Sequence, residues 1–215
     1  SFELVSEVDL PDRIRASMLR LLSREIVSVG VAQMQDVYNG YMRGAVPREE
    51  ILSVYTHKTG RYTFSLPLML GALVAEHDAP ATMGALAELG ERLGRAFQIK
   101  DDELGLFGSA EEIGKPLGSD IVEDKKTVVR SLLLDQVSRK EREELAGWFG
   151  NPDIGEAEIA RIREVAETHG VPELIQEAVE EETERVEAII DSLELRPKGK
   201  ELLRSLSAYN RERVK

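Results

Sequence analysis

The stretch FQIKDDELGLFG, residues 97–108, places two adjacent aspartates, Asp101 and Asp102, inside a run of apolar side chains. An ionised carboxylate is costly to bury unless a partner compensates its charge. Gln98 lies three and four positions before the two aspartates, so on a helix all three share one face. Gly105 continues that face. A polar stripe on a mostly apolar helix favours a bound cation, and the alternative is a surface helix with an acidic edge.

Helical periodicity continues through the rest of the chain, and strand alternation is nearly absent. Pro11, Pro47 and Pro80 each stand where a helix can begin. We expect helices over about 9–38, 47–60, 80–107, 124–149, 155–169, 171–192 and 197–212, a boundary or kink at Pro67, and a loop over 108–120. The second of these helices is expected to end at Lys58 and Thr59. The sequence therefore predicts one all-α domain, residues 1–215, whose neighbouring helices pack antiparallel.

Composition excludes several classes of function. Hydrophobic residues make up 42% of the 215 residues and the net charge is −12. This balance allows a sizeable core and argues against nucleic acid, which requires a basic surface. There is no cysteine, so disulfides, thiolates and cysteine–zinc sites are excluded. We find no secretory signal and no apolar stretch long enough to span a bilayer, which makes the cytoplasm the simplest compartment.

The paired aspartates favour a hard cation, because no histidine or cysteine lies nearby. Such donors suit Mg²⁺ better than Zn²⁺, and Mg²⁺ commonly shares its coordination with water and substrate phosphates. The following stretch EEIGKPLGSDIVEDKKT, residues 111–127, contains Lys115 between glycines, then Lys125 and Lys126. Glycines let backbone N–H groups approach an oxyanion, and lysine adds a point charge. A Walker-type loop is excluded because Pro116 occupies the Ser/Thr position and no strand precedes it.

Taken together, FQIKDDELG, GKPLGSD and EDKKT resemble, in order and spacing, the second aspartate-rich region of the trans-isoprenyl diphosphate synthases, the polyprenyl synthetase family. The family also has a Lys-Thr-Gly/Ala step followed by a tyrosine, which THKTGRY, residues 56–62, resembles. VAQMQDV, residues 31–37, is similar to a family helix with a Gln and an Asp three positions apart. The resemblance extends to about residue 129 and is strongest over 97–127.

The resemblance implies the helical bundle of the isoprenoid synthases and a prenyltransferase. Such an enzyme condenses isopentenyl diphosphate with an allylic diphosphate, to farnesyl or geranylgeranyl diphosphate in the short-chain, archaeal-type members. The hard step separates a carbocation from an anionic leaving group, and Mg²⁺ and lysines neutralise that charge. Members of the family are usually homodimers, which the apolar helix stripes of this chain would allow.

The resemblance also implies roles for individual residues. Asp101 would bind Mg²⁺ directly, and Asp102 would support it as the second metal-site residue. Lys58 and Lys115 would act with Asp101 in catalysis. The residues that would hold the allylic diphosphate and the metal-bound waters are Gln33, Lys58, Thr59, Tyr62, Gln98, Lys115 and Lys125. Lys126 is one position away from the family's lysine and is the weaker candidate.

Two departures from the family pattern stand out. Gly105 replaces the last aspartate of the second motif, as in some archaeal-type synthases, which removes one possible metal ligand. The first aspartate-rich motif is absent, and SFELVSEV, residues 1–8, resembles the segment that follows it. We therefore expect a fragment of a longer enzyme that lacks the N-terminal helices. The alternatives are a non-catalytic subunit that modulates a full-length partner and a class I terpene cyclase, whose Asn/Asp-x-x-Ser/Thr-x-x-x-Glu triad is not found at the matching place.

Overall fold

The computed structural model describes residues 2–42, 44–108 and 118–213, and within these ranges it contains helices and no strand. The elements are α1 (Phe2–Glu7), α2 (Asp12–Tyr41), α3 (Arg48–Tyr55), η1 (Thr56–Ser65), α4 (Leu66–Val74), α5 (Pro80–Phe107), α7 (Ser119–Val122), α8 (Val128–Gln136), α9 (Arg139–Ala146), α10 (Glu156–Thr168), α11 (Val171–Ser192) and α12 (Pro197–Glu212). The prediction of an all-α fold is confirmed.

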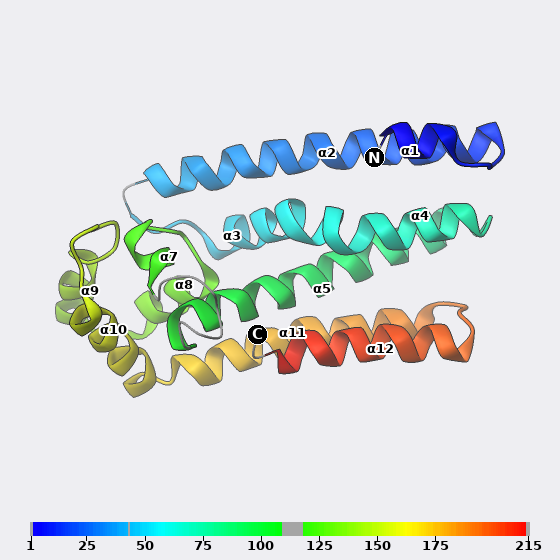
Figure 1. Ribbon diagram of the computed structural model, residues 1–215. Helices are drawn as coiled ribbons and strands as arrows, with labels where there is room; N and C mark the ends of the chain where they lie inside the picture. Colours follow the sequence, from blue (N-terminus) through cyan, green and yellow to red (C-terminus); the bar gives the residue numbers. More distant parts are fainter. Residues whose placement is uncertain (1, 43, 109–117, 214–215) are drawn as a thin grey trace.

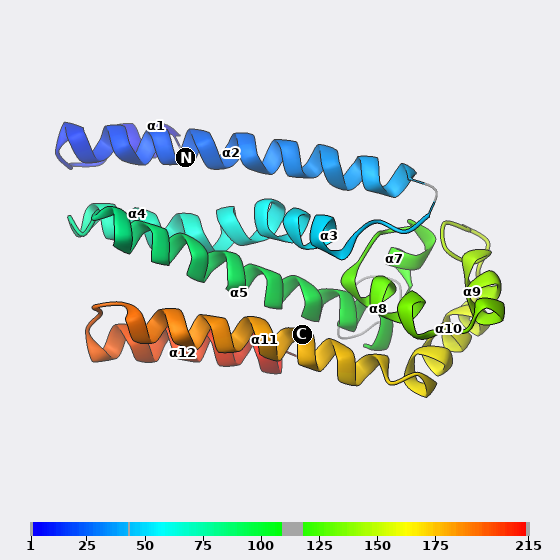
Figure 2. The same cartoon turned by 180° about the vertical axis from the view of Figure 1, so that it is seen from behind.

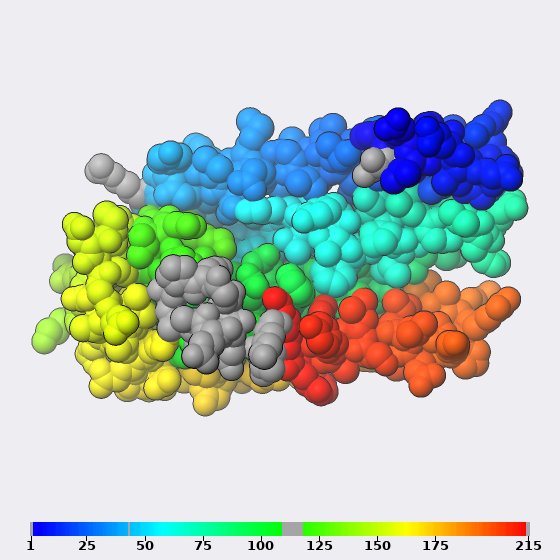
Figure 3. Space-filling view, viewed as in Figure 1, coloured from blue at the N-terminus to red at the C-terminus, as the bar shows by residue number. Residues whose placement is uncertain are grey.

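The long helices form three layers. One layer contains α1 and α2, the middle layer contains the α3–α4 segment with α5, and the third contains α11 and α12 (Figures 1 and 2). The short helices α7 to α10 gather at one end of the bundle. In the space-filling view α1 and α2 form one long edge of the molecule, and α12 forms part of the opposite edge (Figure 3). None of the described helices is both long and apolar enough to cross a membrane.

Several helix boundaries agree with the sequence. Helix α2 begins directly after Pro11, α3 directly after Pro47, and α5 at Pro80. The prediction of one helix over 124–149 is wrong, because α8 ends at Gln136 and α9 begins at Arg139. Ser138 caps α9: its hydroxyl accepts from the backbone N–H of Glu141, whose carboxylate accepts in return from the backbone N–H of Ser138. Such a reciprocal cap starts a new helix.

The predicted helix end at Lys58 and Thr59 is also wrong. Helix α3 continues without interruption into η1, which is π-helical, and then into α4. The N–H of Leu66 donates to the carbonyl of Arg61, five residues back. Pro67 follows at once and has no N–H to donate to a carbonyl four residues back, so it lies where the wide turn returns to α-helix. Lys58 and Thr59 therefore lie in the middle of a long helical segment.

Helices α5 and η1 pack backbone against backbone. A Cβ atom added to Gly94 would lie 2.1 Å from Cα of Gly60, and one added to Gly90 would lie 2.2 Å from the nitrogen of Ser65. No side chain larger than hydrogen fits at either glycine. This contact fixes how η1 lies along α5, and with it the position of every side chain on η1.

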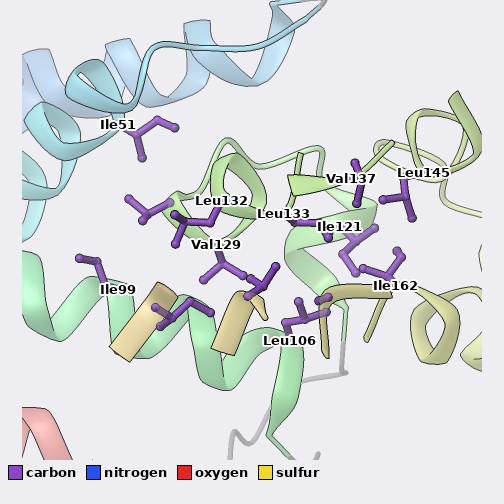
Figure 4. Close-up of a cluster of buried hydrophobic side chains, with 14 of the residues drawn as sticks. Ile51, Ile99, Leu106, Ile121, Val129, Leu132, Leu133, Val137, Leu145 and Ile162 are labelled. Carbon is purple, nitrogen blue, oxygen red and sulfur yellow. The ribbon is translucent and has the colours of Figure 1, made fainter. Parts of the chain in front are cut away.

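Two hydrophobic clusters surround this contact. One joins α3, α5, α7, α8, α9, α10 and α11 at the end that carries the short helices. Figure 4 shows Ile51, Ile99, Leu106, Ile121 and their neighbours from these segments converging there. The other joins α1, α2, α4, α5 and α11 in the opposite half of the bundle. Helix α5 contributes to both clusters, so the aspartate-bearing helix is held along its whole length.

The contact between Gly60 and Gly94 can be tested with a matched pair of substitutions on α5. We expect Gly94→Ala to lower the free energy of unfolding by about 3 kcal/mol, because the added methyl group meets the η1 backbone. Gly84→Ala has nothing within 4 Å of its new Cβ, and we expect it to raise stability by up to about 1 kcal/mol, since alanine is the better helix former. Denaturant titration measures both changes. Equal effects at the two positions would contradict the packing described here.

Candidate active site

A cavity of about 550 Å³ lies between α2, η1 and the segment that follows α7. The residues that line it are Gln33, Asp36, Val37, Gly40, Tyr41, Lys58, Glu123 and Lys125. Three of these, Gln33, Lys58 and Lys125, were predicted from the sequence as substrate-binding residues. The fold brings them to one cavity from three segments that are far apart in the chain.

The two lysines of the cavity are both paired with carboxylates. Nζ of Lys58 lies 2.5 Å from Oδ2 of Asp36 on α2. Nζ of Lys125 lies 3.3 Å from Oδ1 of Asp120 on α7. Burial lowers the pKa of Lys125, but the charges of Asp102 and Asp120 outweigh burial and leave this pKa above its ordinary value. Both lysines are therefore held by short acidic side chains at the edge of the cavity.

The carboxylate of Asp102 is hydrogen-bonded to other side chains rather than exposed to solvent. Its side chain is 3% exposed. The hydroxyl of Tyr55 donates to Oδ2, and Nε2 of Gln98 lies 3.4 Å from Oδ1. Oε1 of Gln98 accepts in turn from the hydroxyl of Thr59 at 3.1 Å. Burial raises the pKa of Asp102 to about 7, although Lys125 and the hydrogen bond from Tyr55 act in the opposite direction.

Asp101 faces a different environment from its neighbour. Its side chain is one-third exposed, and its Oδ1 lies 3.5 Å from Nη1 of Arg213, near the end of the chain. The guanidinium of Arg213 also lies 4.2 Å from the centre of the Phe97 ring. The two adjacent aspartates therefore diverge, since one is enclosed by hydrogen-bond donors and the other remains accessible at the surface of α5.

Two residues at the site were missed by the sequence reasoning. Asp120 lies beside Lys125, and a Cβ atom on Gly105 would lie 3.0 Å from its Oδ2. Asp120 thus brings a carboxylate next to the position where the family motif has its last aspartate. Its signal was the final residue of GKPLGSD. Tyr55 had no comparable signal, because a tyrosine among apolar residues on a helix indicates only the core.

Two other predicted residues, Tyr62 and Lys126, lie apart from this cavity. Tyr62 is half exposed on η1 and is not among the cavity-lining side chains. Lys115 falls within 109–117, outside the described residues. Lys126, the weaker candidate, is buried with its Nζ 2.5 Å from Oδ2 of Asp124, and it lines a separate cavity of about 390 Å³. Of the two consecutive lysines, Lys125 is therefore the one that lines the site.

The donor set suits Mg²⁺ only if water and substrate complete the coordination. Among the described residues no three acidic, histidine or cysteine side chains are placed so that they could hold a metal ion by themselves. Asp101 is an accessible oxygen donor, and Asp102 is fully engaged behind it. A hard cation that keeps several waters and takes its other ligands from phosphate oxygens fits one accessible carboxylate.

Comparisons with known proteins agree with the sequence motifs and the fold. Residues 1–166 match the family model described as polyprenyl synthetase. The chain is 32% identical over 157 residues to a geranylgeranyl diphosphate synthase of Saccharolobus solfataricus, an alignment that covers 73% of this chain and 46% of that protein. It is 34% identical over 174 residues to a farnesyl diphosphate synthase of Geobacillus stearothermophilus, which covers 77% of this chain and 57% of that protein.

Solved structures agree as well. The fold superposes with a TM-score of 0.86 and 30% identity on a geranylgeranyl pyrophosphate synthase of Corynebacterium glutamicum, solved in complex with isoprenyl diphosphate and magnesium. That superposition covers 95% of this chain and 57% of the other. The chain spans about half the length of the curated relatives it matches. The match of the family model over most of the chain shows that this protein belongs to the polyprenyl synthetase family.

Proposed function

We propose that this chain carries the diphosphate-binding part of a trans-isoprenyl diphosphate synthase, which transfers a prenyl group from an allylic diphosphate to isopentenyl diphosphate. The observation that carries the proposal is the meeting of Lys58 and Lys125 at one cavity, together with the proximity of Lys125 to Asp102, with which it lines a second pocket. Two cations and an accessible carboxylate are the groups needed to hold a diphosphate together with a hard metal ion.

In the reaction the bond between the allylic carbon and the diphosphate oxygen breaks, and the bonding electrons leave with the diphosphate. The double bond of isopentenyl diphosphate attacks the resulting carbocation, and loss of a proton completes the product. Negative charge therefore grows on the leaving group in the transition state. Cations that are fixed before the reaction starts stabilise this charge without reorganisation.

The residues of this chain would have separate roles in binding the diphosphate and the metal ion. Lys58 and Lys125 would contact the diphosphate oxygens, exchanging their present carboxylate partners for phosphate. Gln98 and Thr59 hold each other beside the aspartates and would orient the metal-bound waters. Asp101 would hold Mg²⁺, with Asp102 in support. When bound, Mg²⁺ would neutralise charge on the leaving diphosphate. Lys115, which the motif also implies, would add a further cation from the GKPLGSD loop.

We also propose that the chain forms a homodimer through α2. Val27, Val31, Met34, Tyr38 and Tyr41 are all more than half exposed, and their spacing of four, three, four and three residues forms one apolar seam. This spacing is the seam along which two helices pack together. Exposed apolar surface of this extent commonly marks an interface. A second copy of α2 presents the same seam and is the occupant that we favour.

The proposed metal and diphosphate site predicts how the protein responds to ligands. A ligand at one hundred times its Kd raises the free energy of unfolding by ~2.7 kcal/mol. We expect geranyl diphosphate with Mg²⁺ to stabilise the wild-type chain by about this amount, and Mg²⁺ alone to stabilise it little. Denaturant titration with and without EDTA measures the difference.

Two variants of α5 identify the source of this stabilisation. Asp101→Asn is expected to abolish it while leaving the unliganded protein folded. Glu103→Gln is the matched control, because Glu103 is an acid of the same helix that pairs with Lys100 and has no assigned part in the metal site. We expect the control to keep the full effect. An Asp101→Asn protein that is stabilised as strongly as the wild type would contradict the assigned role of Asp101.

The dimer proposal makes a separate prediction. Met34→Glu places a charge at the centre of the α2 seam, and we expect it to convert the dimer into a monomer in sedimentation velocity. Leu202→Glu introduces the same charge at an exposed leucine of α12 and is expected to leave the dimer intact. A wild-type chain that sediments as a monomer, or a dimer that Met34→Glu leaves unchanged, would show that α2 is not the interface.

A further inference from the structure

Tyr55 is a buried phenol at a junction of three helices. It is the last residue of α3, it is 5% exposed, and its ring packs in the hydrophobic cluster that includes Ile99 and Val128. A tyrosine in such surroundings needs a hydrogen-bond partner for its hydroxyl group. Here that group has two partners, and both belong to segments that form the candidate active site.

The hydroxyl of Tyr55 donates to Oδ2 of Asp102 on α5 and accepts from the backbone N–H of Val128 at 3.0 Å. Val128 is the first residue of α8, where a backbone N–H has no partner inside its own helix. One hydroxyl group therefore satisfies a buried carboxylate and a buried helix terminus at once. Removing it would leave both groups short of a partner, which is unfavourable in a buried site.

This arrangement fixes two parts of the site relative to each other. Gln98 holds the other oxygen of Asp102, so the carboxylate is held on both sides and cannot turn toward solvent. Val128 follows Lys125 by three residues, so an anchor at Val128 also limits how far the segment carrying this lysine can move from α5. The contact is long-range in sequence, 73 residues between Tyr55 and Val128.

We propose that Tyr55 is a positioning residue of the magnesium and diphosphate site, which holds Asp102 and the start of α8 in one fixed arrangement. It acts through Asp102 and the Lys125 segment and does not itself contact the ligand. This inference rests on the proposed function, because it assigns Tyr55 a role in the same site. Outer partners of this kind typically change metal affinity by ~10- to 100-fold when they are removed.

The test uses the full chain with inorganic diphosphate and Mg²⁺ as the probe. Calorimetry measures the Mg²⁺ concentration at which diphosphate binding is half-saturated. We expect Tyr55→Phe, which removes only the hydroxyl group, to raise this concentration by ~10-fold or more. Val54→Ala is the control, since it removes buried methyl groups from the same helix without touching Asp102. We expect it to reduce stability and to leave the Mg²⁺ requirement unchanged.

A second comparison separates positioning from packing. Because Tyr55 acts in part through Asp102, Tyr55→Phe should raise the Mg²⁺ requirement less in an Asp102→Asn background than in the wild-type background. An unchanged requirement in the single variant would overturn the inference, and so would an equal loss in both backgrounds. A wild-type chain that binds no diphosphate in the presence of Mg²⁺ would overturn the proposed function itself, and this outcome is distinguishable because it appears before any substitution is made.

Discussion

The close contact between the backbones of η1 and α5 is the constraint on which the site depends. Gly60 and Gly94 touch without side chains between them, so Thr59 reaches Gln98 on the facing helix. The turn that follows carries Arg61, whose guanidinium donates two hydrogen bonds of 2.7 Å to the buried carboxylate of Glu25 on α2. Helix α2, η1 and α5 are thereby held together by one close contact and one buried ion pair.

The ion pair between Arg61 and Glu25 holds α2 beside η1, and residues of both helices line the cavity. Burial raises the pKa of Glu25, but hydrogen bonds and charge from Arg61 outweigh burial and leave this pKa below its ordinary value. The carboxylate therefore stays ionised and paired, and α2 stays in contact with η1 at this level. About three turns further along α2, Asp36 meets Lys58. On η1, Lys58 is directed toward Asp36 of α2, while Thr59 is directed toward Gln98 of α5.

The pair of aspartates shows how much of the site could be predicted from the sequence. Their position on the polar face of a long helix could be predicted, since α5 runs from Pro80 to Phe107 as the periodicity indicates. Their different environments could not, because Asp102 depends on Tyr55 and Asp101 faces Arg213, both remote in sequence. The π-helix was missed because Lys58 and Gly60, with Pro67 downstream, resemble the end of a helix. Motif spacing ranked Lys125 above Lys126, and only the fold shows that Lys126 faces Asp124 instead.

Binding of an allylic diphosphate provides the most direct test of this account. The purified chain is incubated with Mg²⁺ and labelled geranyl diphosphate, beside the Asp101→Asn and Glu103→Gln proteins, and bound label is quantified. The account predicts binding by the wild type and the Glu103→Gln protein, with little binding in EDTA and little by Asp101→Asn. The absence of binding by the wild-type chain, or unchanged binding by Asp101→Asn, would contradict it.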